Sequence, residues 1–239
     1  MLGRLLEISL RTDAIQESLR FYEALGFTQA EVGEVWTHPY AVVTDGRLFL
    51  GLHAAPIETP LPTFVLPRLA QAIAPLEALG IVFEQRQLGD ETFNQASFRD
   101  PGGQLVRLLE ARTYSPPAFD RPAASACGYF SELGLPTRDT DAARAFWEPL
   151  GFVALQEEPG PFSRIVLASD SLNLALYRTR AFREPLLTFE DPHMRERIAM
   201  LRERGIAVRD EMPDRLDAAE NGVLTAPEGT RLLLLQSEE

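Results

Sequence analysis

The sequence predicts an α+β fold built from four copies of one β-α-β-β-β unit, and the main indication is an internal repeat. The segment FYEALGF at residues 21–27 returns as FWEPLGF at residues 146–152. The glycine that ends this motif's helix is followed, 54 residues later in both halves, by a second helix-end glycine, Gly80 or Gly205. Two equal spacings of this kind indicate a duplicated structural unit. We therefore expect two related halves with two units in each.

Each unit is expected to begin with a half-buried strand and continue into an amphipathic helix. In the first unit Leu6, Ile8 and Leu10 alternate with polar residues, which places them on one face of a strand. Asp13 in the first unit and Asp139 in the third are expected to cap the helices that follow. A glycine past the last helical residue supplies the C-terminal cap, and two or three further β-like runs complete each unit.

The two halves are separated by residues 114–127, a stretch rich in Pro, Ala and Ser that we interpret as a linker. One unit is too small to bury both faces of its sheet, so paired units should share a curved mixed sheet with helices outside and a cleft inside. Exchange of units between the halves, or between two chains, is the alternative pairing. The expected domains are 1–113 (units 1–55 and 61–113) and 128–239 (units 128–180 and 185–239).

Composition restricts the partners that the protein can have. The net charge is −12, so nucleic acid and anionic membrane surfaces would be repelled at long range. No run of residues is long enough to span a bilayer. The single cysteine, Cys127, rules out an internal disulfide and favours a reducing compartment. We expect a cytoplasmic monomer or homodimer whose partner is a small molecule, acidic or aromatic in character.

Several motifs together are similar to a known family. The β-α-β-β-β units, the FY-x-x-LGF helix end and the DPGGQLVRLLE segment at residues 100–110 resemble the vicinal oxygen chelate superfamily, which includes glyoxalases, bleomycin-resistance proteins and extradiol dioxygenases. APEGTRLLLL at residues 226–235 is a weaker copy of the last motif. The resemblance covers nearly the whole chain outside the linker and implies two glyoxalase-like domains. It implies no single activity, because this fold hosts many.

The resemblance also implies where a metal would be held. Metal-dependent members place His, Gln or Glu on the first and last strands of each unit. Here the first-strand positions are Glu7 and Glu132, which could ligate, but the last-strand position after DPGG is Arg107 and its counterpart is Leu233. A guanidinium has no lone pair to offer. We therefore expect a degenerate metal site and no cofactor.

His53 is the residue that could restore a metal site. It alternates with Phe49 and Gly51, so it should face the same cleft as Glu7. A divalent metal ion held by Glu7 and His53 is the alternative to a cofactor-free protein. His38 falls in a loop before a proline. Four aromatic residues in loops or at strand edges are suited to contacting an apolar or aromatic ligand: Trp36, Phe93, Phe119 and Phe162.

The predicted roles of the cleft residues follow from their charges. We expect an ion pair between Glu7 and Arg107, with Arg107 as a clamp for a carboxylate or enolate and Glu7 as a candidate base. In the second half, polar side chains are expected to point inward, with Arg164 or Arg178 as a partner for the glutamate. The predicted ligand-binding residues are Arg107, His53, Phe49, Glu132, Asn173 and Tyr177.

Three classes of function remain. The favoured one is a small-molecule-binding protein of the bleomycin-resistance type, in which no bond is broken. The alternative is a glyoxalase, dioxygenase or epimerase type of enzyme, a lyase or oxidoreductase, that uses Glu7 as ligand or base. The third is a structural or regulatory protein whose clefts are filled by side chains. The sequence contains no phosphate-binding loop, dinucleotide fingerprint or nucleophile elbow.

Overall fold

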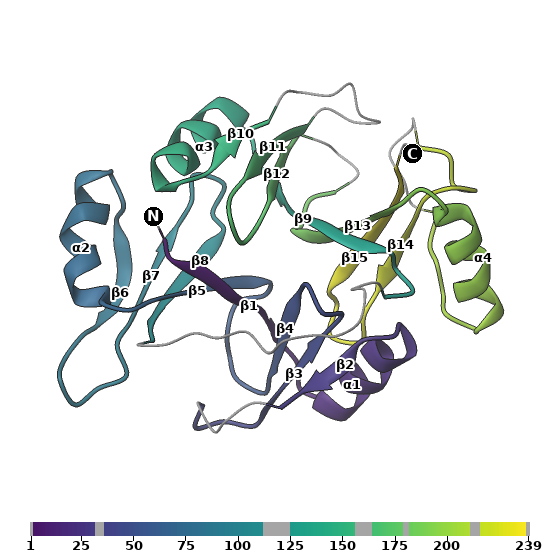
Figure 1. Ribbon diagram of the computed structural model, residues 1–239, viewed down its shortest axis with the longest axis horizontal. Coiled ribbons are helices and arrows are strands. Elements are labelled where there is room, and N and C mark those ends of the chain that lie inside the picture. Colours follow the sequence, from purple (N-terminus) through teal and green to yellow (C-terminus); the bar gives the residue numbers. More distant parts are fainter. Residues whose placement is uncertain are drawn as a thin grey trace.

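The computed structural model describes residues 2–31, 36–111, 125–155, 164–178, 182–210 and 216–237. These residues form two mixed β-sheets, of eight and seven strands, with four α-helices. Figure 1 shows the helices around the periphery, with α2 (Leu69–Ala78) and α4 (Met194–Glu203) at opposite ends of the molecule. The predicted α+β class and the four paired units are confirmed.

The first sheet combines the first two units. Its strand order is β2-β3-β4-β1-β5-β8-β7-β6, and α1 (Ile15–Ala24) and α2 belong to it. The central strand β1 is parallel to β4 and antiparallel to β5, so the two units of the first half pair with each other. The strands are β1 Arg4–Arg11, β2 Thr28–Ala30, β3 Tyr40–Thr44, β4 Phe49–His53, β5 Leu61–Leu66, β6 Phe83–Gln87, β7 Gln95–Arg99 and β8 Leu105–Glu110.

The second sheet repeats this arrangement with the order β10-β11-β12-β9-β13-β15-β14. Its helices are α3 (Thr140–Trp147), which continues into a 3-10 turn at Glu148–Leu150, and α4. Where the first sheet has β6, the described residues of the second have an isolated bridge from Arg209 to Val223. The strands are β9 Tyr129–Pro136, β10 Val153–Ala154, β11 Arg164–Ala168, β12 Leu174–Tyr177, β13 Leu186–Asp191, β14 Gly222–Thr225 and β15 Arg231–Gln236.

The predicted helix caps are confirmed in one half and wrong in the other. Asp139 accepts a hydrogen bond from the backbone N–H of Ala142 at 3.0 Å and so caps α3. α1 begins one residue later than its aspartate allows, at an N-cap of Ala14 that makes no side-chain cap. There Thr12 Oγ1 accepts from the Ala14 N–H at 3.2 Å. Asp13 lies 3.7 Å from the guanidinium of Arg11 instead.

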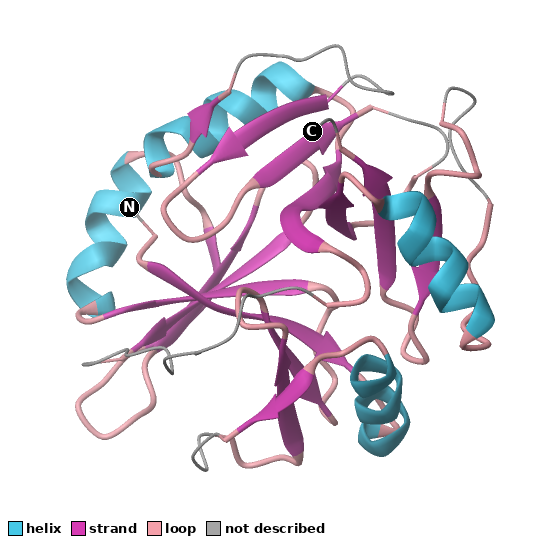
Figure 2. Cartoon of the chain, turned by 45° about the vertical axis from the view of Figure 1, so that its right-hand side comes forward, coloured by secondary structure: helices cyan, strands magenta, loops and turns pink. Residues whose placement is uncertain are grey.

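The two sheets share one hydrophobic core, which the helices cover from outside (Figure 2). Two aromatic side chains at equivalent positions of the repeat cross between the halves. Trp147 Nε1 donates to Asp100 Oδ2, in the turn between β7 and β8, at 3.2 Å. Tyr22 donates its hydroxyl to Glu228 Oε1, in the turn between β14 and β15, at 2.7 Å. Each half therefore anchors the other's last turn.

Part of the predicted organisation falls outside the described residues. Of the linker at 114–127, the structure describes only the last three residues, which end in the buried Cys127. Phe119 and Phe162 also lie outside the described residues. Within the described ranges, none of the helices combines the length and the apolar character needed to cross a bilayer.

Candidate functional site

One face of the first sheet carries polar side chains, although most of them are buried. On β1, Ile8 and Leu10 point into the shared core, so Glu7 and Ser9 point to the opposite face. The strand register places Glu7 opposite Thr63, Ser9 beside Gly51, and Thr63 beside Arg107. We call this set the first polar face, and its members are Glu7, Ser9, Gly51, His53, Thr63 and Arg107.

A β-bulge lies directly before the glutamate at the centre of this face. The pairing of β1 with β5 shifts register between Leu5 and Glu7. The same shift occurs in the second half, where Phe130 and Glu132 pair with adjacent residues of β13. A bulge bends a strand and changes the direction of the side chain beside it. Because both halves have it, the bulge belongs to the repeated unit, and the periodicity of the sequence gave no sign of it.

The glutamate begins a hydrogen-bonded chain that includes two histidines. Glu7 Oε1 accepts from Ser9 Oγ at 2.6 Å and lies 2.7 Å from His53 Nε2. The other ring nitrogen of His53, Nδ1, lies 2.9 Å from His38 Nε2. When the carboxylate is ionised, His53 donates from Nε2 to Glu7, and its Nδ1 accepts the N–H of His38. We call this arrangement the Glu7–His53–His38 chain.

Burial increases from one end of this chain to the other. His38 is half-buried, whereas Glu7 and His53 are only 4% and 0% exposed. The pKa of His38 is lowered from its ordinary value, first by burial and then by electrostatic interaction with His53 and with the cation Arg107, while Glu7 acts in the opposite direction. A lowered pKa keeps His38 neutral at pH 7, so it can accept a proton.

Aromatic rings surround the outer end of the chain. The Trp36 ring lies 5.4 Å from the His53 ring in an edge-on arrangement and 6.0 Å from Phe93. Tyr40 stacks on His53 at 5.7 Å. The guanidinium of Arg107 lies over the Trp36 ring, 5.4 Å from its centroid. The site thus combines a proton-accepting imidazole, a cation and apolar ring surfaces.

The structure corrects the predicted ion pair between Glu7 and Arg107. Among the described residues, no ion pair within 4.0 Å joins them; Glu7 turns toward His53 and Arg107 toward Trp36. The reason is topological, since β5 with Thr63 lies between β1 and β8. Two strand spacings separate the glutamate from the arginine, about 10 Å in a regular sheet. Burial lowers the pKa of Arg107, and the charge of Glu7 partly opposes this.

The position of the Glu7 carboxylate requires a glycine at residue 51. A Cβ at this position would come within 2.3 Å of Glu7 Oε1, so the carboxylate occupies that space. We expect Gly51→Ala to push the carboxylate away from Ser9 and His53 and to lower the free energy of unfolding by about 1–3 kcal/mol, measured by urea denaturation. The matched control is Ala175→Gly at the equivalent position, with an expected cost of about 0.5–1 kcal/mol. Equal costs for the two variants would contradict this assignment.

The equivalent face of the second sheet has a different character. Glu132 forms a 3.2 Å ion pair with Arg164, one of its two predicted partners, and Arg164 also lies 3.1 Å from Glu190. The pKa of Glu132 is raised to about 7, chiefly by burial; Arg164 lowers it and Glu190 raises it further. Thr188 and Leu233 take the places of Thr63 and Arg107.

The other predicted residues of the second half do not join Glu132 in one polar site. Tyr177 is buried and donates its hydroxyl to the backbone oxygen of Glu184 at 2.9 Å. Asn173 donates from Nδ2 to the backbone oxygen of Ser131 at 3.1 Å. Apolar side chains fill the face around Tyr177: Phe182, Leu186, Val223, Leu233 and Leu235. The structure thus places Tyr177 against apolar side chains, with its hydroxyl bonded to the backbone.

In the first half, the structure places three of the predicted residues on one face and one farther away. Glu7, His53 and Arg107 belong to the first polar face. Phe49 lies at the opposite end of β4 from His53, paired with Thr44. His38, whose role the sequence did not reveal, enters the site from the loop before β3, where strand alternation cannot place a side chain.

Comparisons with known proteins give the fold. No protein-family profile matches the chain, and no curated protein matches it in sequence. A halotolerant catechol dioxygenase structure is similar with a TM-score of 0.61 and 16% identity over 98% of this chain and 86% of that one. A mutant of homoprotocatechuate 2,3-dioxygenase from Brevibacterium fuscum gives 0.64 and 17% over 100% and 72%. The 2,2',3-trihydroxybiphenyl 1,2-dioxygenase of Sphingomonas wittichii strain RW1 gives 0.59 and 13% over 98% and 90%.

These comparisons correct the expectation that the protein uses no cofactor. The similar structures are dioxygenases that depend on Fe(II), and this finding contradicts the expectation of no cofactor. That expectation was drawn from Arg107 and Leu233, two strand positions. Substitutions on strands say nothing of donors on loops, such as His38, which the sequence could not place.

The donors that this chain presents do not fit an iron site. Non-haem Fe(II) is usually held by two His and one carboxylate that converge on one point. Glu7, His53 and His38 instead form a line in which each bonds the next. Throughout the described ranges there is no group of three or more His, Cys, Asp or Glu that could hold a metal ion. The comparisons show that the chain has the fold of these dioxygenase structures, which supports the suspected resemblance to the vicinal-oxygen-chelate fold.

Proposed function

We propose that the protein binds a small aromatic acid over the first polar face and that the Glu7–His53–His38 chain exchanges a proton with it. The observation that carries the proposal is this chain, which runs from a buried carboxylate to a half-buried imidazole beside Trp36 and Arg107. The function is that of an acid–base enzyme acting on a carbon acid, in the class of isomerases and epimerases.

The Glu7–His53–His38 chain has the order of groups that general-base catalysis needs. His38 is neutral because its pKa is lowered, and its Nε2 is bonded to His53, which leaves Nδ1 to accept a proton. The positive charge that then forms is stabilised through His53 by the carboxylate of Glu7. A carboxylate behind a histidine serves the same purpose in catalytic triads.

Arg107 and the aromatic rings support the choice of ligand. A guanidinium binds a carboxylate or an enolate with charge-assisted hydrogen bonds. Trp36 and Phe93 provide apolar surface for a ring. An aromatic ligand also agrees with the similar structures, which include catechol dioxygenases and a homoprotocatechuate dioxygenase in complex with HPCA.

The test uses phenylpyruvate, an aromatic acid with an exchangeable C–H beside its carbonyl. Exchange of this proton for deuterium is followed by NMR with the wild type, Glu7→Gln and His38→Gln. Loss of general-base catalysis should slow the catalysed exchange by about 10²–10⁴-fold. His193→Gln is the matched control, because His193 is exposed at the start of α4 and should leave the rate unchanged.

Binding is measured separately by the quenching of tryptophan fluorescence. Arg107→Gln should weaken phenylpyruvate binding, while His38→Gln should retain it. Binding without any catalysed exchange in the wild type would contradict proton transfer and leave a binding protein. A wild type that does not bind phenylpyruvate at millimolar concentration would contradict the aromatic-acid ligand itself.

A further inference from the structure

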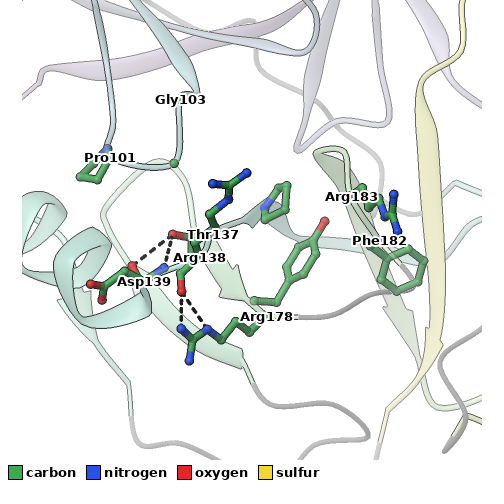
Figure 3. A pocket seen from close by; sticks show the side chains of 11 residues that line it. Pro101, Gly103, Thr137, Arg138, Asp139, Arg178, Phe182 and Arg183 are labelled. Atoms are coloured by element: carbon green, nitrogen blue, oxygen red, sulfur yellow. Dashed lines mark hydrogen bonds between the residues drawn. The ribbon is translucent and has the colours of Figure 1, made fainter.

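A cavity lies at the junction of the two halves, away from the first polar face. It has a volume of about 1100 Å³ and lies where the end of β9 meets the turn between β7 and β8. Figure 3 shows Arg138 and Arg178 on one side of it and Arg183 beside Phe182 on the other, with the turn of Pro101 and Gly103 above.

Three arginines dominate the charge of this cavity. Arg138, Arg178 and Arg183 are exposed, and within the described parts of the chain none has an acidic group within 4.0 Å. Arg178 is held in place because its Nε donates to the backbone oxygen of Arg138 at 2.8 Å. The carboxylate on the lining, Asp139, is already engaged as the cap of α3. Three guanidinium groups that form no ion pair with the described acidic residues are unexpected in a chain of net charge −12.

The internal repeat gives a second, smaller cavity with which this one can be compared. At the equivalent junction, where the end of β1 meets the turn between β14 and β15, a cavity of about 390 Å³ is lined by Arg11, Asp13, Glu17 and Glu228. The DPGG and APEG motifs align Gly102 with Glu228. Glu228 accepts hydrogen bonds from Ser18 and Tyr22, both at 2.7 Å, so its carboxylate is part of the packing.

The two junctions therefore share a backbone plan but have opposite charge. Packing between the halves does not require three arginines, since the smaller junction is lined by one arginine and three acidic side chains. In the larger junction Gly102, which has no side chain, lines the cavity at the position that Glu228 takes in the smaller one. The hydroxyl of Thr137 and the ring of Phe182 add a hydrogen-bonding group and an apolar wall.

We propose that the larger cavity is a binding site for a small polyanion with two or more carboxylate or phosphate groups. Arg138 and Arg178 bind one anionic group and Arg183 binds another, while Phe182 contacts the carbon skeleton. Guanidinium groups suit both carboxylate and phosphate oxygens, to which they donate charge-assisted hydrogen bonds. This site is separate from the one proposed for the aromatic acid.

The test is calorimetric titration with citrate and with inorganic pyrophosphate, which distinguishes carboxylate from phosphate ligands. We expect at least one to bind the wild type, and the double variant Arg138→Gln/Arg178→Gln to bind it at least about tenfold more weakly. Arg20→Gln/Arg204→Gln removes the same charge at exposed positions of α1 and at the end of α4, and should bind as the wild type does.

A second variant tests the comparison between the junctions. Gly102→Glu places a carboxylate where the smaller junction has Glu228, and it should abolish binding of the same anion. Its circular dichroism and thermal unfolding report whether the turn still folds, and the arginine variant does not disturb the turn. Binding of neither anion to the wild type at millimolar concentration, or equal binding to the arginine variant, would overturn the proposal.

Discussion

Replacing Trp147 by alanine is expected to lower the free energy of unfolding by at least about 4 kcal/mol. Truncating a fully buried tryptophan costs about 3–5 kcal/mol through lost contacts and the cavity that remains. A further cost arises because Asp100, only 5% exposed, loses the indole N–H that it accepts across the junction. Chemical denaturation of the purified variant measures the sum.

Trp147→Phe separates the hydrogen bond from the cavity. It retains most of the packing and removes the indole donor, so it should cost less than alanine does. A double-mutant cycle with Asp100→Asn gives the coupling between the two side chains, expected at about 1–2 kcal/mol. Tyr22→Phe is the matched variant in the other half, where Glu228 keeps its bond from Ser18. Strict additivity in the cycle would contradict a contribution from the bond.

Glu132 is expected to make the stability of the protein fall as the pH rises from about 4.5 to about 7. Its pKa is raised from an ordinary 4.5 to about 7 by burial. The folded state therefore binds more protons than the unfolded state between these values, and stability decreases with pH. This difference in pKa corresponds to a loss of about 3 kcal/mol in the free energy of unfolding. The loss is absent below pH 4.5 and complete above pH 7.

Glu132→Gln should remove this part of the pH dependence. Urea denaturation at a series of pH values gives the slope for the variant and the wild type. Burial also raises the pKa of Asp45 and Asp100, so both contribute slopes of the same sign. They remain in both proteins, so the difference between the curves isolates Glu132. Glu196→Gln, at an exposed position of α4, should keep the full slope; a parallel curve for Glu132→Gln would contradict the raised pKa.

The sequence predicted the fold well because the evidence for it is local. A repeated helix end, alternating strands and glycines at helix ends each depend on a few neighbouring residues. Gly26, for example, has a φ of 89°, a value that glycine adopts without strain. The same alternation placed Glu7 and His53 on one face correctly.

The site was predicted less well because it depends on residues that local patterns do not relate. The sequence shows that Glu7 and Arg107 face the same side but not that β5 lies between them. It gives no position for His38, which comes from a loop. It also places Tyr177 on a face that other segments, through Phe182 and Val223, fill with apolar side chains.

The crossed contacts of Tyr22 and Trp147 have a consequence for the molecule as a whole. A half separated from the other would expose its aromatic ring, and its last turn would lose the hydrogen-bond donor that the other half supplies. Loosening one sheet removes support from the other, so we expect the two halves to unfold together in one cooperative transition rather than independently.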